Sequence, residues 1–401
     1  MHIDDDTRQL VDQINESVEK CWNCNFCYSK CPLNLSTVGF MKYGPSGLTQ
    51  GTYYALKWGL TDQEQERGEL LNMLYACTTC NDCVLTCKQN SAGIPILEII
   101  ENARKLLTEN NIGPLPSQRT VLKAMNLKGN PYNYAPEDRF NWLTNSQVDS
   151  QVKFFPEKQA DVLYYAGCTP SYDSDLHQIP QNIVKIMQAA GVDFALHRDE
   201  SCCGCSAKVL GDEYLFRDFA DKNSRVFVES GVKTVVTSSP HCYNTYKNEY
   251  GLKGDIEILH YTQLLARELK NLKLERELDY LVTYHDPCYL SKHNSVCAEP
   301  RELIKAVKGI EFVEMEDSGE DSLCCGGGGG RMWAEVEEEN PIGETRVLQA
   351  LAVGANVLLT ACPWCYTMLR DAAKNLDCQD KIRIMDITEL LCEALDEEGR
   401  Q

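Results

Sequence analysis

The spacing of apolar residues divides this chain into a helical first part and an alternating second part. Apolar residues recur at intervals of three and four in residues 9–20 and 94–107, which predicts amphipathic helices. Strand-like runs are scarce before residue 110. Residues 111–158 are rich in glycine, proline and aromatic residues, which predicts a connector that packs down on the protein.

Short apolar runs alternate with helical segments from residue 159 onward. Strands are predicted at residues 162–166, 235–238, 281–284 and 357–360, with helices such as 182–190 and 301–307 between them. This alternation is typical of an α/β domain with mostly parallel pairing.

The alternating part also repeats itself. Cys168 and Cys288 lie 120 positions apart, and so do Cys242 and Cys362, which indicates a duplicated domain. Each predicted strand leads within a few residues to one of these cysteines. Since ligands bind at the carboxyl ends of parallel strands, we expect the cysteines to build sites there. The predicted fold is an α+β multidomain chain: a helical domain at 1–110, the connector at 111–158, and two α/β domains at 159–270 and 271–401.

Composition narrows the range of functions. The chain has 401 residues, 21 cysteines and a net charge of −20. The start of the chain is acidic and lacks the apolar run of a signal peptide, so we expect the reducing cytoplasm, where clustered cysteines bind metals or carry redox chemistry. The charge argues against nucleic acid and anionic lipid as partners and favours a basic redox protein. Residues 347–369 are uncharged, but they contain a proline and two motif cysteines, so no membrane span is expected.

Two cysteine runs near the N-terminus have ferredoxin spacing. One is Cys21, Cys24, Cys27 and Cys31, followed by proline; the other is Cys77, Cys80, Cys83 and Cys87, followed by Lys88. This spacing is used for [4Fe–4S] cubanes, and in two-cluster ferredoxins the fourth cysteine binds the other cluster. We therefore predict that Cys21, Cys24, Cys27 and Cys87 hold one cubane, and that Cys77, Cys80, Cys83 and Cys31 hold the second. Zinc sites seldom use this triple short spacing.

A third group of cysteines lies in the second half of the repeat. His285-Asp286-Pro287-Cys288 is followed by Cys324-Cys325-Gly326 with glycines through Gly330, and then by Cys362-Pro363-Trp364-Cys365. Five cysteines exceed the four ligands of a tetrahedral zinc ion.

These motifs resemble the "CCG" cysteine-rich domain family. A two-cluster ferredoxin unit followed by two such domains resembles the D-type catalytic subunit of heterodisulfide reductase and related iron–sulfur subunits. The resemblance implies a non-cubane [4Fe–4S] cluster held by Cys288, Cys324, Cys325, Cys362 and Cys365, at which substrate disulfides are cleaved. Gly326, Gly327 and Gly328 have no side chains, so their backbone N–H groups can approach an anionic cluster.

The first half departs from the family pattern. It has Cys168, Cys202, Cys203 and Cys242, but Thr245 stands at the last cysteine position, and Cys205 is an extra thiol. Three interpretations stay open: a different cluster, substitution by Cys205, or a degenerate site that is only structural.

Other candidate residues lie around these motifs. His285 is a candidate proton donor to a leaving thiolate, or a strand-end histidine bonded to backbone. Lys292 and Arg331 are candidates for binding an anionic substrate or offsetting cluster charge. Thiols outside every motif are expected to be ordinary buried cysteines: Cys297, Cys378 and Cys392.

The sequence leaves two functions to compare. The first is disulfide reduction or thiol oxidation at the non-cubane cluster, fed by two cubanes. The second is an electron relay between a flavoprotein dehydrogenase and a quinone-reducing membrane partner such as a b-type cytochrome, which would place the chain on the inner face of the membrane through that partner. No dinucleotide fingerprint is present, so nicotinamide and flavin are expected on partner proteins.

Overall fold

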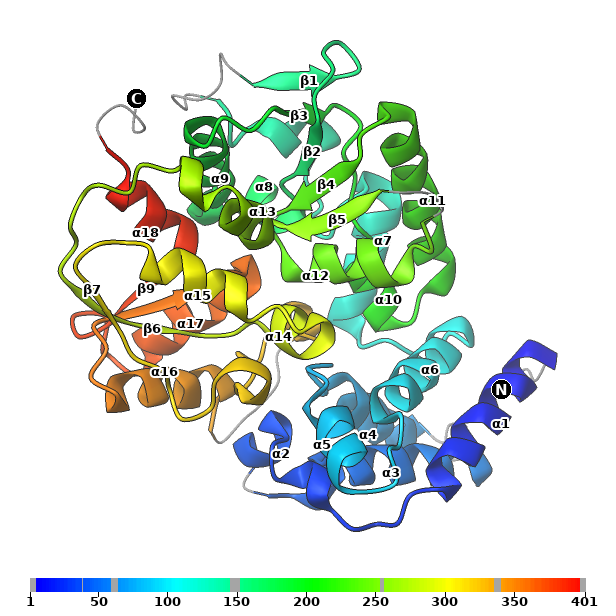
Figure 1. Ribbon diagram of the computed structural model, residues 1–401. Coiled ribbons are helices and arrows are strands. Elements are labelled where there is room, and N and C mark those ends of the chain that lie inside the picture. The colour runs from blue at the N-terminus through cyan, green and yellow to red at the C-terminus, as the bar shows by residue number, and fades with distance from the viewer. Residues whose placement is uncertain are drawn as a thin grey trace. The chain divides into compact units, whose positions relative to one another are not determined.

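The computed structural model describes residues 5–37, 39–58, 64–144, 152–252, 256–334 and 340–396, which form two compact units (Figure 1). The first unit comprises Met1–Lys123, Ser206–Leu215 and Leu323–Thr345. The second unit comprises Ala124–Cys205, Phe216–Ser322 and Arg346–Gln401. Each unit therefore gathers segments from distant parts of the chain, and the domain boundaries proposed from the sequence stay a prediction.

The first unit is helical in the residues that the structure describes. Its helices are α1 (Asp5–Glu19), α2 (Pro32–Ser36), α3 (Pro45–Lys57), α4 (Glu64–Tyr75), α5 (Asp82–Asn90), α6 (Ile96–Glu109) and α7 (Pro116–Lys128), which runs into the second unit. The helices predicted at 9–20 and 94–107 are confirmed as α1 and α6. α6 packs against α1 and α3 because Ile99, Ile100, Ala103, Leu106 and Leu107 form one buried face.

The second unit contains two parallel sheets. The first has the order β1–β3–β2–β4–β5 and the second the order β7–β6–β8–β9. The strands are β1 (Lys153–Phe155), β2 (Val162–Tyr165), β3 (Phe194–His197), β4 (Thr234–Thr237), β5 (Glu257–His260), β6 (Tyr280–Tyr284), β7 (Ile310–Phe312), β8 (Val357–Thr360) and β9 (Arg383–Asp386). The four predicted strands are confirmed as β2, β4, β6 and β8.

The order of the strands confirms the internal duplication. β3, β2, β4 and β5 in the first sheet correspond to β7, β6, β8 and β9 in the second. The helices that follow along the chain are α8 (Cys168–Tyr172), α9 (Gln178–Ala189), α10 (Cys205–Leu210), α11 (Glu213–Ser230), α12 (Pro240–Asn244), α13 (Tyr261–Arg267), α14 (Cys288–Asn294), α15 (Ala298–Lys305), α16 (Ile342–Ala352), α17 (Pro363–Asn375) and α18 (Ile387–Ala394). Nearly all of α10 and the starts of α11 and α16 belong to the first unit. The two halves pack together through α9 against α18 and α13 against α15.

The last helix of each half is capped in the same way. His260 accepts a hydrogen bond from the backbone N–H of Thr262 at the start of α13, and Asp386 does the same for Thr388 at the start of α18. The N-termini of both helices are capping boxes, in which side chains accept hydrogen bonds from N–H groups that the first helical turn leaves unpaired. The Tyr261 hydroxyl then donates to Asp386 at 3.0 Å and ties the two halves together.

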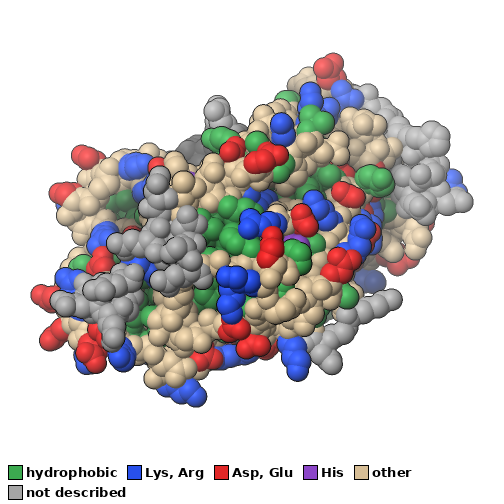
Figure 2. All heavy atoms as spheres, turned by 90° about the horizontal axis from the view of Figure 1, so that it is seen from above, with side chains coloured by type: hydrophobic (Ala, Val, Ile, Leu, Met, Phe, Trp, Pro, Cys, Tyr) green, Lys and Arg blue, Asp and Glu red, His purple; other side chains and the backbone are tan. Residues whose placement is uncertain are grey.

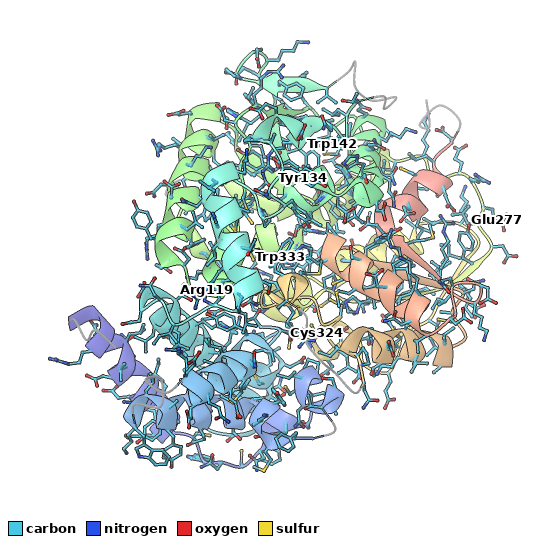
Figure 3. The ribbon with its side chains drawn as sticks, turned by 180° about the vertical axis from the view of Figure 1, so that it is seen from behind. Arg119, Tyr134, Trp142, Glu277, Cys324 and Trp333 are labelled. Atoms are coloured by element: carbon cyan, nitrogen blue, oxygen red, sulfur yellow. The ribbon has the colours of Figure 1, made fainter. Side chains whose placement is uncertain are left out.

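The connector is more ordered than its glycines and prolines predict. It contains all of α7, a 3₁₀ turn at Pro136–Phe140, and β1, which adds an edge strand to the first sheet. Trp142 is fully buried, whereas Tyr134 is 51% exposed (both labelled in Figure 3), so the connector packs down at Trp142 and not at Tyr134. Residues 145–151 of the connector lie outside the described residues. Breaker residues mark the ends of such elements and leave room for a 13-residue helix between them.

Two surface observations bear on the function. In the part of the chain that the structure describes, no helix is long and apolar enough to cross a membrane. Residues 347–369 are instead divided among α16, β8 and α17. On the face in Figure 2, basic and acidic side chains are interspersed, so the net charge of −20 is not gathered there into one acidic surface.

Candidate iron–sulfur sites

Two cysteine-lined hollows lie in the first unit. One is lined by Cys31, Cys77, Cys80 and Cys83, and the other by Cys21, Cys24, Cys27 and Cys87. Each hollow thus brings together three cysteines of one motif and the fourth cysteine of the other. This grouping is compatible with crossed ligation of two cubanes, which stays a prediction.

The backbone of the two motifs has the same shape. Asn23 and Thr79, which precede the second cysteine of each motif, have φ values of +52° and +54°, and Asn25 and Asn81, which follow it, have values of +63° and +76°. Asparagine tolerates this left-handed conformation better than most residues. The repeated positive φ values turn each short loop so that its three cysteines line one hollow.

The fourth cysteines lie on different local structures. Cys31 precedes α2 and Pro32 is the first residue of that helix, where proline is well tolerated. Cys87 lies inside α5, which continues to Asn90. A proline in place of Lys88 would remove a helical hydrogen bond and clash with the preceding turn. The departure from the usual Cys-Pro sequence therefore follows from the helix.

The chemistry of both hollows fits an anionic iron–sulfur cluster. Burial raises the pKa of Cys27 to about 11 and that of Cys31 well above the ordinary value for a thiol. A thiolate here needs a cation as partner, because burial disfavours the charged form. Backbone N–H groups already face the sulfurs: Ile94 donates to Cys87 at 3.2 Å and Thr79 to Cys77 at 3.5 Å. Such donors orient and tune a cluster.

The Cys-Cys-Gly segments of the two halves share one local geometry. The Gly326 N–H points to the Cys324 sulfur at 3.4 Å, and the Gly204 N–H points to the Cys202 sulfur at 3.5 Å. Both glycines have positive φ, at +93° and +80°. Glycine is favoured here because residues with a Cβ rarely adopt this conformation. The first pair lies in the first unit, and the second pair lies in the second unit.

The other three cysteines of the complete motif lie in the second unit. Cys288 is the first residue of α14, Cys362 precedes the first residue of α17, and Cys365 lies in its first turn. All three are buried. They follow β6 and β8, at the carboxyl end of the second sheet, where the sequence predicted them. The joint binding of one cluster by these residues with Cys324 and Cys325 stays a prediction.

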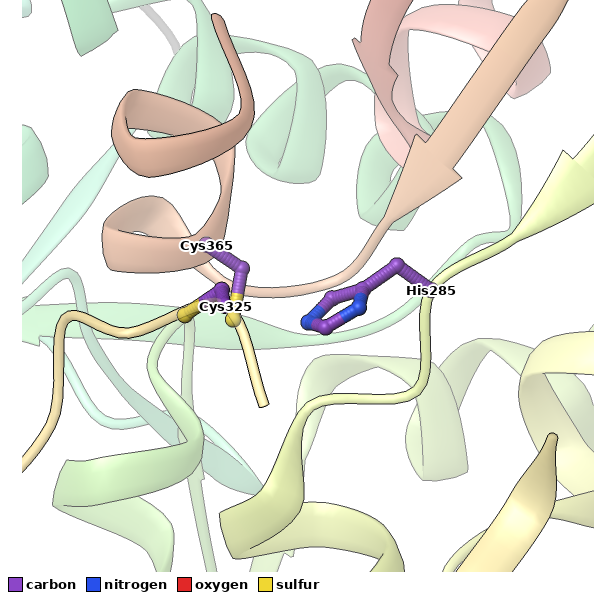
Figure 4. A group of neighbouring side chains, drawn as sticks. All are labelled: His285, Cys325 and Cys365. Carbon is purple, nitrogen blue, oxygen red and sulfur yellow. The ribbon is translucent and has the colours of Figure 1, made fainter. Parts of the chain in front are cut away.

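His285 lies between the end of β6 and α14, and its ring points toward Cys365 (Figure 4). A ring nitrogen of His285 and the Cys365 sulfur lie within 4.8 Å of each other. The buried Arg346 donates from Nε to His285 Nδ1 at 3.1 Å. Burial and this positive charge lower the pKa of His285 well below its ordinary value. The accepting Nδ1 of a neutral ring leaves the proton on Nε2, so His285 is a neutral N–H donor rather than a charged acid.

The neighbouring Asp286 fixes the same segment. Arg301 donates to both of its carboxylate oxygens, at 2.7 and 2.9 Å, and the Gly319 N–H donates at 2.8 Å. A bidentate arginine–carboxylate pair gives geometric specificity. The stretch that leads into Cys288 is therefore held rigidly.

The incomplete motif forms a continuous group of buried sulfurs. The Cys242 thiol lies 3.3 Å from the Cys203 sulfur, and Cys202 is hydrogen-bonded to both Cys203 and Cys168. The bonds from Cys168 and Cys203 lower the pKa of Cys202. Thr245 and Cys205 are also buried, on the segments after Cys242 and Cys203. Four thiols gathered in this way can bind a metal centre.

A buried ion pair adjoins this sulfur group. Arg139 donates to the Cys168 sulfur at 3.4 Å and to Glu200 Oε1 at 3.1 Å. The same carboxylate oxygen accepts from the Gly167 N–H at 2.9 Å. The exposed fractions of the two side chains are only 3% and 0%. Arg139 supplies positive charge beside sulfurs that become thiolates when they bind a metal.

The structure also places the remaining candidates. Lys292 is buried, and Arg331 donates to backbone carbonyls of Gly326 and Ala76. Among the thiols outside the motifs, Cys378 is buried as expected. Cys297 and Cys392 are partly exposed, so the prediction of burial was wrong for these two. Cys297 is the N-cap residue of α15, and Cys392 lies in α18 with its thiol directed to the Asn182 carbonyl on α9.

Sequence reasoning missed the arginines that support these sites. Arg139, Arg346 and Arg104 are each buried against cysteine-bearing segments. A lone arginine in a polar stretch looks like a surface residue, and no local pattern marks it. One weak signal in the sequence was Glu200: a charged residue just before a Cys-Cys pair that is expected to be buried needs a basic partner, which the structure shows to be Arg139.

Comparisons with known proteins agree with this geometry. Residues 162–247 and 282–370 match the model of the CCG cysteine-rich domain, and residues 17–91 match the model of the 4Fe-4S dicluster domain. These matches, together with the cysteine-lined hollows, define the class as iron–sulfur proteins that join a 4Fe-4S dicluster domain to two cysteine-rich domains.

Three relatives narrow the class. The chain is 31% identical, over 97% of both chains, to the D-type subunit of the dihydromethanophenazine:CoB–CoM heterodisulfide reductase of Methanosarcina barkeri. It is 37% identical to the iron-sulfur-binding oxidoreductase FadF of Bacillus subtilis and 34% identical to the EtfAB:quinone oxidoreductase of Syntrophomonas wolfei. Each match covers 80% of this chain and 46% of the relative, so the chain spans about half the length of these two proteins. The chain belongs to the family of iron–sulfur proteins that includes the D-type subunits of heterodisulfide reductase.

Proposed function

We propose that this chain carries electrons through two cubanes to a non-cubane cluster, where a disulfide is reduced or thiols are oxidised. The observation that carries the proposal is the crossed set of cysteines in the two hollows of the first unit. Crossed ligation places two cubanes side by side, as in two-cluster ferredoxins. The non-cubane cluster would be held by Cys288, Cys324, Cys325, Cys362 and Cys365.

A disulfide takes two electrons, whereas each cluster passes one. A cluster held by the five cysteines named above would supply the one-electron steps by which a disulfide and two electrons give two thiolates. Because His285 presents a neutral N–H beside Cys365, it would donate a hydrogen bond to a sulfur there and would not hand over a proton as an imidazolium. This assignment replaces the acid role that the sequence suggested for His285.

We also propose that Cys168, Cys202, Cys203 and Cys242 bind a further metal centre. The hydrogen-bonded chain of sulfurs and the adjoining Arg139 support this over a purely structural role. Four sulfurs suit either a tetrahedral metal ion or a cluster. Metal analysis separates the outcomes: two cubanes and the non-cubane cluster give about 12 irons, a fourth four-iron cluster adds about four, and a single zinc ion adds none.

A second candidate function is an electron relay without a small-molecule substrate. The higher identities to FadF and to the EtfAB:quinone oxidoreductase, at 37% and 34%, favour it. In this case a flavoprotein would supply electrons and a quinone-reducing membrane partner would accept them.

Electron paramagnetic resonance on anaerobically purified protein tests the two functions. The protein is oxidised in the presence of a panel of thiols, one at a time. A new paramagnetic signal that requires one particular thiol supports disulfide chemistry at the cluster. Full iron content without any thiol-dependent signal supports the relay. Zinc in place of iron at all sites would contradict both.

A further inference from the structure

The glycine run after Cys324-Cys325 packs against the second ferredoxin motif within the first unit. A Cβ on Gly328 would overlap the carbonyl oxygen of Thr78, and one on Gly329 would overlap that of Cys77. Backbone therefore lies against backbone here, which only glycine permits. Residues more than 240 positions apart in the sequence are in direct contact, and one of them is a predicted cubane ligand.

Arg104, on α6, locks this contact. It is fully buried, and its donors all go to backbone carbonyls. Nη2 donates to Cys77 at 2.8 Å while Nη1 donates to Gly329 at 2.9 Å. The remaining bonds go to Leu74 and Val209. These five bonds use all five N–H donors of the guanidinium. The Arg104 side chain therefore links the backbone of the second ferredoxin motif to that of the glycine run.

Two further side chains repeat the same link. Arg331 donates from Nη1 to Ala76 at 3.0 Å and from Nε to Gly326 at 2.8 Å. Gln118, on α7, is fully buried and donates to the Gly330 carbonyl at 3.1 Å. Each of these bonds satisfies a backbone carbonyl that would otherwise lose its partner on burial. The glycine run is therefore held at its start by Arg331 and at its end by Arg104 and Gln118.

We propose that Arg104, Arg331 and Gln118 are positioning residues that set the distance between the second cubane and the cluster at Cys324-Cys325. The inference rests on the proposed function, because it requires both clusters. The glycines would then have two roles: they let the backbone lie against Cys77 and Thr78, and they leave N–H groups free to approach a cluster. One electron would leave the cubane bound by Cys77, Cys80, Cys83 and Cys31 and reduce the cluster at Cys324-Cys325, with dithionite as the external reductant in the test.

Gly329→Ala is the principal test. The new Cβ would push the run away from Cys77, and the φ of +64° would strain alanine in any case. Gly231→Ala is the matched control, because Gly231 has a φ of +69° but open space around the added Cβ. Gln118→Ala is a milder second variant that removes one bond to the run without adding bulk.

The readouts are iron content, the spectrum of each cluster, the magnetic coupling between the two clusters, and the rate of electron transfer followed by rapid freeze-quench. We expect Gly329→Ala and Gln118→Ala to keep their iron, to weaken the magnetic coupling and to slow electron transfer relative to the wild type, because both the coupling and the tunnelling rate fall as the clusters move apart. Gly231→Ala is expected to behave as the wild type. Unchanged coupling and rate in both variants would overturn the inference alone. Wild-type protein without a non-cubane signal would overturn the proposed function, and the inference with it.

Discussion

Arg139→Met tests the ion pair beside the incomplete cysteine motif. The substitution leaves Glu200 buried, with 0% of its side chain exposed, and removes the only charged donor to its Oε1 among the contacts described above. The Gly167 N–H still donates to the same oxygen. Methionine has a similar length, so the change removes charge more than volume.

The expected magnitude follows from burial. Removing one partner of a buried pair costs about 3–5 kcal/mol, because an uncompensated charge remains. In a unit of this size about 1 kcal/mol lowers the melting temperature by about 2–4 °C, so the loss is roughly 6–20 °C. Arg139→Met with Glu200→Gln is expected to recover much of it, since a pair replaced on both sides leaves no buried charge.

The assay is anaerobic thermal unfolding followed by circular dichroism, with metal content measured in parallel. Arg198→Met is the matched control: Arg198 pairs with Glu157 at 2.9 Å, but their side chains are 58% and 53% exposed. Exposed pairs contribute only about 0–1 kcal/mol. Metal bound by the four-cysteine group is also expected to fall in Arg139→Met and not in Arg198→Met.

The effect has a definite pH dependence. Burial raises the pKa of Glu200, and the loss of Arg139 removes an interaction that lowers it. Because the pKa of Glu200 is higher in the folded state, burying this carboxyl costs no folding free energy at a pH below its ordinary pKa, where it is protonated in both states. The cost grows as pH rises through the raised pKa. The variant should therefore be closest to the wild type at acidic pH. Equal destabilisation by Arg139→Met and Arg198→Met, or a deficit that is independent of pH, would refute the argument.

Three further predictions concern other parts of the chain. Cys31→Ser should damage the cubane of the second motif and Cys87→Ser that of the first, as seen in the spectrum of each cluster; damage to the local cluster instead would contradict crossed ligation. Burial lowers the pKa of His260 to about 3, so the stability that its neutral ring contributes is complete above its ordinary pKa and is lost as pH falls toward 3. His260→Asn keeps a side chain that can cap α13 but cannot titrate, so the fall in unfolding free energy at acidic pH, on the order of 5 kcal/mol, should become smaller. Denaturant titrations at several pH values measure this fall, and an unchanged fall in the variant would assign it to other groups. Leu391→Ala, at a fully buried position in α18, should cost about 2–5 kcal/mol, whereas Leu348→Ala at a 52% exposed position should cost far less, and equal losses would contradict the burial argument.

The ferredoxin motifs and the α/β repeat could be predicted from the sequence because their signals are local. The three short-spaced cysteines of each motif lie within one loop, and a buried parallel strand such as β8 is a continuous apolar run. The duplication was visible because each of the four predicted strands leads within a few residues to a cysteine, at a repeat distance of 120 positions.

The contacts between distant segments became known from the folded chain and not from any local pattern. β1 has three residues, too few for a pattern, and it forms a strand because β3 lies beside it. Arg104 and Arg139 look like surface residues in the sequence, since nothing nearby shows that their donors meet carbonyls, a carboxylate and a sulfur far along the chain. Periodicity reports how one element faces its surroundings, whereas a buried charge is stabilised by partners that only the folded chain supplies. The glycine run shows the same limit: its composition indicated a close approach, and the structure identified the backbone of Cys77 and Thr78 as what it approaches.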